Sequence, residues 1–165
     1  MVATSDYVER AFALELRIQA LHADYAHCVD DDRLEEWPEY FTADGRYRVI
    51  TRENHDLGLP VSLMYCDGRG MLADRISAMR TANVFEPHTY CHTTGTPRIS
   101  HSVGNEHHVR ANFSVTRTMS DGEMSMFACG KYLDRVIEEA DRILLVERTV
   151  VLDSRRIDTL LVIPL

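Results

Sequence analysis

The run DDDRLEEWPEYF, residues 30 to 41, places several carboxylates beside a tryptophan, a tyrosine and a phenylalanine. Carboxylates among apolar side chains are suited to general acid–base chemistry, because burial raises the pKa of a carboxyl group toward neutrality. A structural interpretation is simpler. Asp32 and Glu35 have the form of a helix cap with a reciprocating carboxylate, and Pro38 should split the segment into two short turns. We therefore interpret the carboxylates as turn and cap residues, and the aromatic residues as core.

The histidines are the next candidates for chemistry, because imidazole is a common metal ligand. In an extended strand, His107 and His108 point to opposite faces, so one ion cannot bind both. A Rieske cluster needs Cys-x-His and Cys-x-x-His, and neither spacing occurs in the sequence. A mononuclear iron site asks for two histidines and a carboxylate, and the sequence alone does not locate that carboxylate. We predict no metal and no cofactor in this chain. The densest group is His88, Cys91, His92, His101, His107 and His108.

Tyr25 and His92 are the residues that best fit an acid–base site. The run DYAHCVDDDRLEEW resembles the first-helix region of the ketosteroid isomerases, and Tyr25 falls on their oxyanion-stabilising tyrosine. Val49 stands where their catalytic aspartate would be, and valine cannot abstract a proton. An alternative enzyme, a stand-alone dehydratase or isomerase acting on a small hydrophobic ligand, would use Tyr25 and His92 for proton transfer. Tyr25 is more simply explained as part of the core stripe of the first helix. No Gly-x-Ser-x-Gly elbow or Walker-type loop occurs.

Two helices are predicted to position these residues. From Ala11, apolar residues recur every three or four positions and indicate a helix of about five turns. A second amphipathic helix should start near Asp67. The first stripe consists of Ala11, Leu14, Ile18, Leu21, Tyr25 and Cys28, and the second helix carries Leu72, Ile76 and Met79 on one face.

Strands dominate the rest of the chain. Residues 45–52 and 61–66 contain strand formers, and residues 109–116 alternate apolar and polar side chains as in a half-exposed strand. Ser120-Asp121-Gly122 predicts a hairpin turn into a strand through Phe127 and Tyr132. Residues 142–153 are apolar at odd and even positions, which indicates a central strand, and the tail DTLLVIPL could add an edge piece. The expected fold is α+β: a cone in which a curved antiparallel sheet wraps around a long N-terminal helix.

Composition limits the classes of function. The chain has 165 residues and a formal net charge of −8, which indicates a single domain, 1–165, that does not bind nucleic acid. It contains no apolar run of membrane-span length and no basic, apolar leader at its start, so we expect no membrane association and a cytoplasmic location. The four cysteines lie far apart and should be reduced thiols.

Two segments of the C-terminal half carry a more specific resemblance. The run VRANFSVTRTMSDGEMSMFACGKYLDRV, residues 109–136, is similar to the Phe-Ala-x-Gly-x-x-x-Asp segment of the small, or β, subunits of aromatic-ring-hydroxylating dioxygenases. The run ILLVERTVVLD, residues 143–153, resembles their Arg-x-x-x-Leu-Asp strand through Arg148, Leu152 and Asp153. WPEYFTADGRYRV, MLADRISAMR and EPHTYCHTTGTPRI occupy the expected order upstream. The chain departs from many members at residues 83–88, where it reads NVFEPH.

This resemblance implies a nuclear-transport-factor-2-like cone that does not perform the chemistry itself. The Rieske 2Fe–2S cluster and the mononuclear iron would belong to a large α subunit, and the β subunit would support an α3β3 assembly. Alone, it would form a homotrimer or another homo-oligomer. The substrate would be an aromatic acid such as terephthalate, salicylate or benzoate. By residue type, Trp37, Tyr40, Arg110 and Arg117 are candidate interface contacts. A third hypothesis is a ligand-binding or purely self-associating protein of the same fold.

Overall fold

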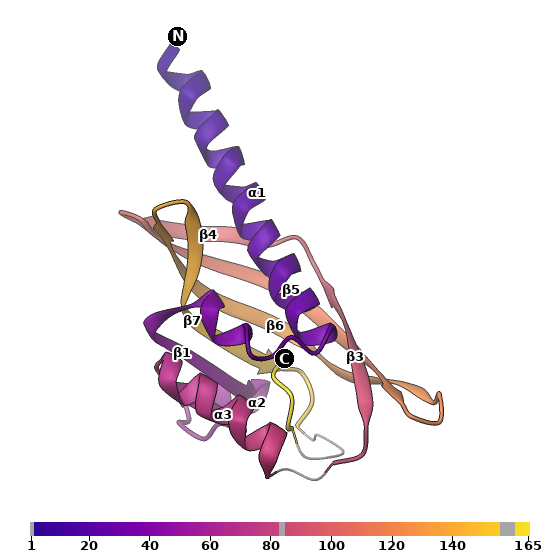
Figure 1. Cartoon of the computed structure of the whole chain (residues 1–165). Coiled ribbons are helices and arrows are strands. Elements are labelled where there is room, and N and C mark those ends of the chain that lie inside the picture. The colour runs from indigo at the N-terminus through magenta and orange to yellow at the C-terminus, as the bar shows by residue number, and fades with distance from the viewer. Residues whose placement is uncertain (1, 83–84, 156–160) are drawn as a thin grey trace.

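The first helix is only partly packed against the rest of the molecule. The computed structural model of the chain describes residues 2–82, 85–155 and 161–165, and α1 spans Val2–Asp30. Of the predicted stripe, the members from Ile18 to Cys28 are buried, whereas Ala11 is exposed and Leu14 is half-buried. The N-terminal half of α1 extends beyond the sheet, and the C-terminal half lies across it (Figure 1). The helix is confirmed: Leu14 packs against the core beside the four buried members of the stripe, and Ala11 is the member that lies outside it.

The acidic segment after α1 forms turns, as predicted, but without the predicted cap. A short 3-10 helix, η1, covers Trp37–Tyr40 and has Pro38 in its first turn. Asp32 and Glu35 do not cap it. Instead, both carboxylates bind the guanidinium of Arg80 at 2.8 Å, because a charge-assisted pair is stronger than a bond to a backbone amide. The capping-box prediction is therefore wrong.

The strands form one sheet with the order β2-β1-β7-β6-β5-β3. β4 lies off this path and pairs with the N-terminal half of β5. Two further helices accompany it: α2 covers Arg52–Asp56, and α3 covers Arg69–Thr81 and buries the predicted Leu72, Ile76 and Met79. Figure 1 shows the curvature of the sheet and α3 beside β1. The strands are β1 Phe41–Thr51, β2 Met64–Asp67, β3 His88–Thr94, β4 Arg98–Val103, β5 Glu106–Met119, β6 Met124–Glu139 and β7 Arg142–Leu152.

One pair of strands departs from the antiparallel prediction. β1 runs parallel to β7, with Val49 opposite Val150, while the other paired strands are antiparallel. A parallel pair cannot be joined by a tight hairpin and needs a long connection. Here the chain from α2 to β6 provides that connection, and no local signal in either strand reveals it. The α+β cone is confirmed, with a mixed rather than a purely antiparallel sheet.

The strand patterns read from the sequence are largely confirmed. Val109, Ala111, Phe113 and Val115 are buried on one face of β5, and β7 is central, between β1 and β6. The hairpin turn also lies where predicted. Met119 and Glu123 close it through a backbone hydrogen bond of 2.9 Å, and Gly122 adopts a φ of 90°, which favours glycine.

The C-terminal tail does not extend the edge of the sheet. Residues 158–160 of the predicted piece lie outside the described residues, and the remainder, 161–165, forms no strand. Leu161, Val162 and Leu165 are instead buried in the main core beneath α1. Burying apolar side chains stabilises this arrangement more than exposing them at an edge would. Within the described residues, no helix is long and apolar enough to cross a membrane.

Candidate functional site

A buried group of charged residues lies on the concave side of the sheet, toward α1. Arg148 of β7 donates two hydrogen bonds to Asp134 of β6, at 3.0 and 2.7 Å, and both side chains are fully buried. His22 of α1 places Nε2 3.0 Å from the same carboxylate. Asp134 and Arg148, one charged residue from each of the two quoted sequence motifs, thus face each other across adjacent strands. Sequence analysis identified neither as a site residue, although a charge within the apolar run 142–153 was a usable signal.

Aromatic rings complete the surroundings of this ion pair. The guanidinium carbon of Arg148 lies 4.1 Å from the ring centroid of Tyr25 and 4.2 Å from that of Tyr132. A cation between two aromatic faces is favourable once it is desolvated. The Phe113 ring stacks on Tyr132 from the other side, with centroids 4.3 Å apart. The arrangement holds a charge in the core without exposing it to solvent.

The protonation states in this cluster follow from burial and pairing. Burial opposes the charged form of Asp134, but Arg148 and His22 outweigh it and hold the pKa of the carboxyl below its ordinary value. Burial lowers the pKa of His22, although Asp134 acts in the other direction. Burial also raises the pKa of Tyr25 to about 12, despite the nearby Arg148. At neutral pH the cluster therefore consists of an aspartate, an arginine, a neutral histidine and a protonated phenol.

The predicted catalytic phenol is bound to the chain's own tail. Tyr25 Oη donates to the backbone oxygen of Leu165 at 3.0 Å, and Tyr47 Oη donates to the same oxygen at 3.1 Å. The Leu165 amide donates back to Tyr47 Oη at 2.8 Å. Leu165 itself has no exposed surface. The tail thus occupies the space that a ligand of Tyr25 would need.

His92 belongs to a different cluster. Its Nδ1 lies 2.5 Å from Oδ1 of Asp30, and its backbone amide donates to Oδ2 of the same carboxylate at 2.7 Å. The imidazole is fully buried, and its Nε2 has no hydrogen-bond partner in the described part of the chain. Among the described residues, no hydrogen bond or ring contact joins His92 to Tyr25. The structure therefore places the two predicted proton-transfer residues in separate surroundings.

The remaining histidines are also divided between faces. His88, Tyr90 and His92 share a face of β3 as predicted, with ring centroids 5.0 Å and 6.2 Å apart along the strand. His107 is buried beside Ser102, whereas His108 is half-exposed and stacks on His101. The described residues contain no group of three or more His, Cys, Asp or Glu side chains placed to hold a metal ion. The described residues therefore do not fit a Rieske cluster or a mononuclear iron.

The acidic run that opened the sequence analysis has structural partners. Asp30 binds His92, and Arg33 pairs with Asp31 and Glu36. Arg80 holds Asp32 and Glu35, and Arg69 pairs with Glu39. Trp37 and Phe41 are fully buried in the core. Trp37 therefore cannot serve as the surface contact suggested by its residue type. Arg117 is likewise buried, over the Phe127 ring, whereas Arg110 is exposed.

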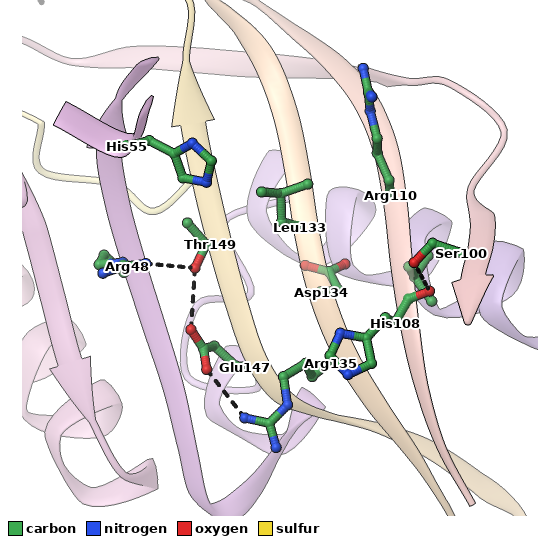
Figure 2. A pocket seen from close by; sticks show the side chains of 11 residues that line it. Arg48, His55, Ser100, His108, Arg110, Leu133, Asp134, Arg135, Glu147 and Thr149 are labelled. Carbon is green, nitrogen blue, oxygen red and sulfur yellow. Dashed lines mark hydrogen bonds and ion pairs between the residues drawn. The ribbon is translucent and has the colours of Figure 1, made fainter. Parts of the chain in front are cut away.

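The opposite, outer face of the sheet carries a hollow of about 390 Å³ (Figure 2). Its floor includes four residues that are register partners on four adjacent strands: Arg110 of β5, Leu133 of β6, Thr149 of β7 and Arg48 of β1. His55 of α2 lies on one side and Ser100 of β4 on the other, as Figure 2 shows. We call this region the outer-face hollow; its lining side chains include Arg48, His55, Ser100, His108, Arg110, Leu133, Arg135, Glu147 and Thr149.

Comparison with known proteins decides the family. Residues 25–159 match the family model described as the ring hydroxylating beta subunit. The chain belongs to this family of ring-hydroxylating dioxygenase beta subunits. The matched range contains both the Asp134–Arg148 pair and the outer-face hollow. The resemblance read from residues 109–153 is confirmed.

Individual relatives agree with this family. A terephthalate 1,2-dioxygenase beta subunit from Comamonas sp. is 42% identical, over 92% of this chain and 98% of its own length. The small subunit of anthranilate 1,2-dioxygenase from Burkholderia cepacia is 39% identical, over 90% of this chain and 92% of its own. A crystal structure of a beta subunit from Novosphingobium aromaticivorans, assigned to an aromatic-ring-hydroxylating dioxygenase, superposes with a TM-score of 0.87. It is 42% identical and covers 94% of this chain and 99% of its own.

Proposed function

We propose that this beta subunit is a non-catalytic assembly component of an oxygenase that dihydroxylates an aromatic acid. The observation that carries the proposal is the filled interior of the cone. A small-molecule enzyme needs a concave, accessible site that converges on its catalytic groups. Here the tail residue Leu165 is bound by the phenols of Tyr25 and Tyr47, and Arg148 is enclosed between rings. The interior is thus organised for stability rather than for turnover.

The proposed partner is a large α subunit, in an α3β3 assembly. That subunit would hold the Rieske 2Fe–2S cluster and the mononuclear iron, which together supply electron transfer and dioxygen activation. The described residues of this chain offer no ligand group for either. The names of the terephthalate and anthranilate relatives support an aromatic acid as the substrate class. We further propose that the chain is one domain, 1–165, and that it works in the cytoplasm.

Co-expression with a large subunit of this family tests the assignment. We expect the tagged chain to co-purify with the large subunit in equal amounts, and light scattering to give the mass of three copies of each. Metal analysis of the chain alone should find no stoichiometric iron. A chain that binds no large subunit, or that binds iron stoichiometrically by itself, contradicts the proposal.

A second candidate function is favoured by one observation, the geometry of His92. A carboxylate that orients an imidazole and leaves its other nitrogen free is the arrangement of a general base. Asp30 orients His92 in this way. The alternative is the stand-alone dehydratase or isomerase with His92 and Tyr25 as proton-transfer residues. Turnover of a ketosteroid or scytalone-like substrate by the lone chain, lost in His92→Gln and Tyr25→Phe, would favour this candidate over the first.

A further inference from the structure

The outer-face hollow has the opposite charge to the chain as a whole. The formal net charge of the chain is −8, yet Arg48 and Arg110 flank this hollow. Arg110 is exposed and forms no ion pair within the described part of the chain. Arg48 makes only a 3.5 Å contact to the Thr149 hydroxyl, and its Nε is buried without a partner among the described residues. Two guanidinium groups thus remain available to an anionic partner.

The third arginine of the hollow is already neutralised. Arg135 binds Glu106 through two nitrogens, at 2.8 and 3.1 Å, and reaches Glu147 at 3.4 Å. The available positive charge is therefore confined to the row of Arg110, Leu133, Thr149 and Arg48. Since neighbouring strands lie about 4.8 Å apart, the two backbones that carry Arg48 and Arg110 are about 14 Å apart. A partner that fits would present carboxylates beside an apolar side chain that covers Leu133.

The chain carries such an element at the far end of the same strands. The hairpin tip, residues 119–126, joins β5 to β6 and protrudes from the body in orange (Figure 1). It contains Asp121 and Glu123 and no lysine or arginine, and neither carboxylate forms an ion pair within the described residues. Met124 and Met126 beside them are 71% and 65% exposed. Flexible thioether side chains adapt well to a binding surface.

The hairpin tip cannot reach the hollow of its own chain. Arg110 and Met119 are nine residues apart on β5, which separates them by about 30 Å along the strand. Contact between these complementary surfaces therefore requires another copy. Two different surfaces of one chain that bind each other make a heterologous contact, which closes into a ring when the rotation permits.

We propose that the hairpin tip of one copy binds in the outer-face hollow of a second copy of this chain. Asp121 and Glu123 pair with Arg110 and Arg48, and a methionine of the tip covers Leu133. The contact assigns a specific surface to self-association, which goes beyond the proposed role as an assembly subunit. Because its strength depends on partly exposed charges, it should weaken as the salt concentration rises.

Charge reversal tests the contact in the full-length chain, with sedimentation velocity as the measurement. We expect the wild-type chain to form a closed oligomer, and Arg110→Glu and Asp121→Arg each to raise the dissociation constant about tenfold or more, since each variant places like charges together. The double variant Arg110→Glu, Asp121→Arg should restore self-association. Arg10→Glu, which changes an exposed arginine on α1 by the same charge, is the matched control and should have no effect.

Three results would overturn the proposal: a monomeric wild-type chain, unchanged association in Arg110→Glu, or failure of the double variant to recover. Circular dichroism checks folding. Both positions are exposed and form no ion pair within the described residues, and Asp121 loses only the hydrogen bond that it accepts from the Glu123 amide, so the fold should tolerate the changes. Co-purification with the large subunit is a separate readout. It can succeed when the self-contact is wrong, and it can fail when the self-contact is right.

Discussion

Asp134 is the residue on which the buried polar cluster depends, because its carboxylate accepts from Arg148 and also contacts His22. Removing one member of a buried ion pair leaves the other charge desolvated and unpaired. Asp134→Asn should therefore lower the free energy of unfolding by about 3–5 kcal/mol, measured by urea denaturation. Asp141→Asn removes an exposed carboxylate from the β6–β7 turn and should change it by less than about 0.5 kcal/mol. Equal effects of the two variants would contradict the structural role assigned to the pair.

His22 gives the stability of the protein a specific pH dependence. Its pKa in the folded state is lowered by burial below the ordinary 6.5, so the unfolded chain binds a proton first as the pH falls. The stability contributed by the neutral imidazole is complete above pH 6.5 and is lost below it. Asp134, whose folded pKa is also lowered, adds a second loss below its ordinary 3.8.

Urea unfolding at about pH 7.5 and about pH 5.5 measures the contribution of His22. We expect wild-type protein to be less stable at the lower pH, and His22→Gln to show a smaller difference between the two. His27→Gln, at an exposed position of the same helix, serves as the control and should behave like wild type. An unchanged pH difference in His22→Gln would show that the loss arises elsewhere.

The role of the C-terminal tail, residues 161–165, was the hardest to predict from the sequence. Tyr25 and Tyr47 both bind Leu165, and their contributions to stability should differ. Tyr47 both donates to the Leu165 oxygen and accepts from its amide, whereas Tyr25 only donates to that oxygen. Tyr47→Phe therefore leaves a buried amide unpaired and should cost about 1–3 kcal/mol of unfolding free energy. Tyr25→Phe keeps the ring against Arg148 and should cost only about 0.5–1.5 kcal/mol. Denaturant titrations of the two variants would refute this ranking if Tyr25→Phe proved the more damaging.

Among the helices and strands, the sequence predicted the features that depend on residues close together in the chain. The alternation in β5, the apolar run of β7 and the turn at Gly122 all follow from period and turn chemistry. The parallel pairing of β1 with β7 depends on contacts distant in sequence, so neither strand reveals it. The failed cap has a similar cause: Arg80, far along the chain, binds Asp32 and Glu35 more strongly than backbone amides do.

The candidate site shows the same limit. Sequence analysis named Tyr25 and His92 as the proton-transfer residues of an alternative enzyme, and the structure buries both side chains. It could not show that the Tyr25 hydroxyl donates to the Leu165 oxygen or that His92 binds Asp30, because tertiary packing brings both partners into contact. Asp134 and Arg148 were quoted within motifs, but their pairing required the register of β6 against β7.

The molecule as a whole combines a stable interior with an outer surface suited to contacts. The polar groups on the concave side are largely engaged with one another or with the tail, whereas Arg48 and Arg110 outside are available. Under the proposed function, such a scaffold would affect the oxygenase through assembly. Substitutions inside the cone should then change stability without changing the chemical step at the iron of the proposed partner.

Turnover of an aromatic acid by the reconstituted complex, expressed per mole of iron, tests this claim most directly. Complexes containing wild-type chain, Tyr25→Phe or His92→Gln would be compared after light scattering has shown the same assembled mass. We predict the same turnover for all three, since neither side chain touches the reacting atoms. A loss of about tenfold or more in either variant, with the assembly intact, would contradict a purely structural role.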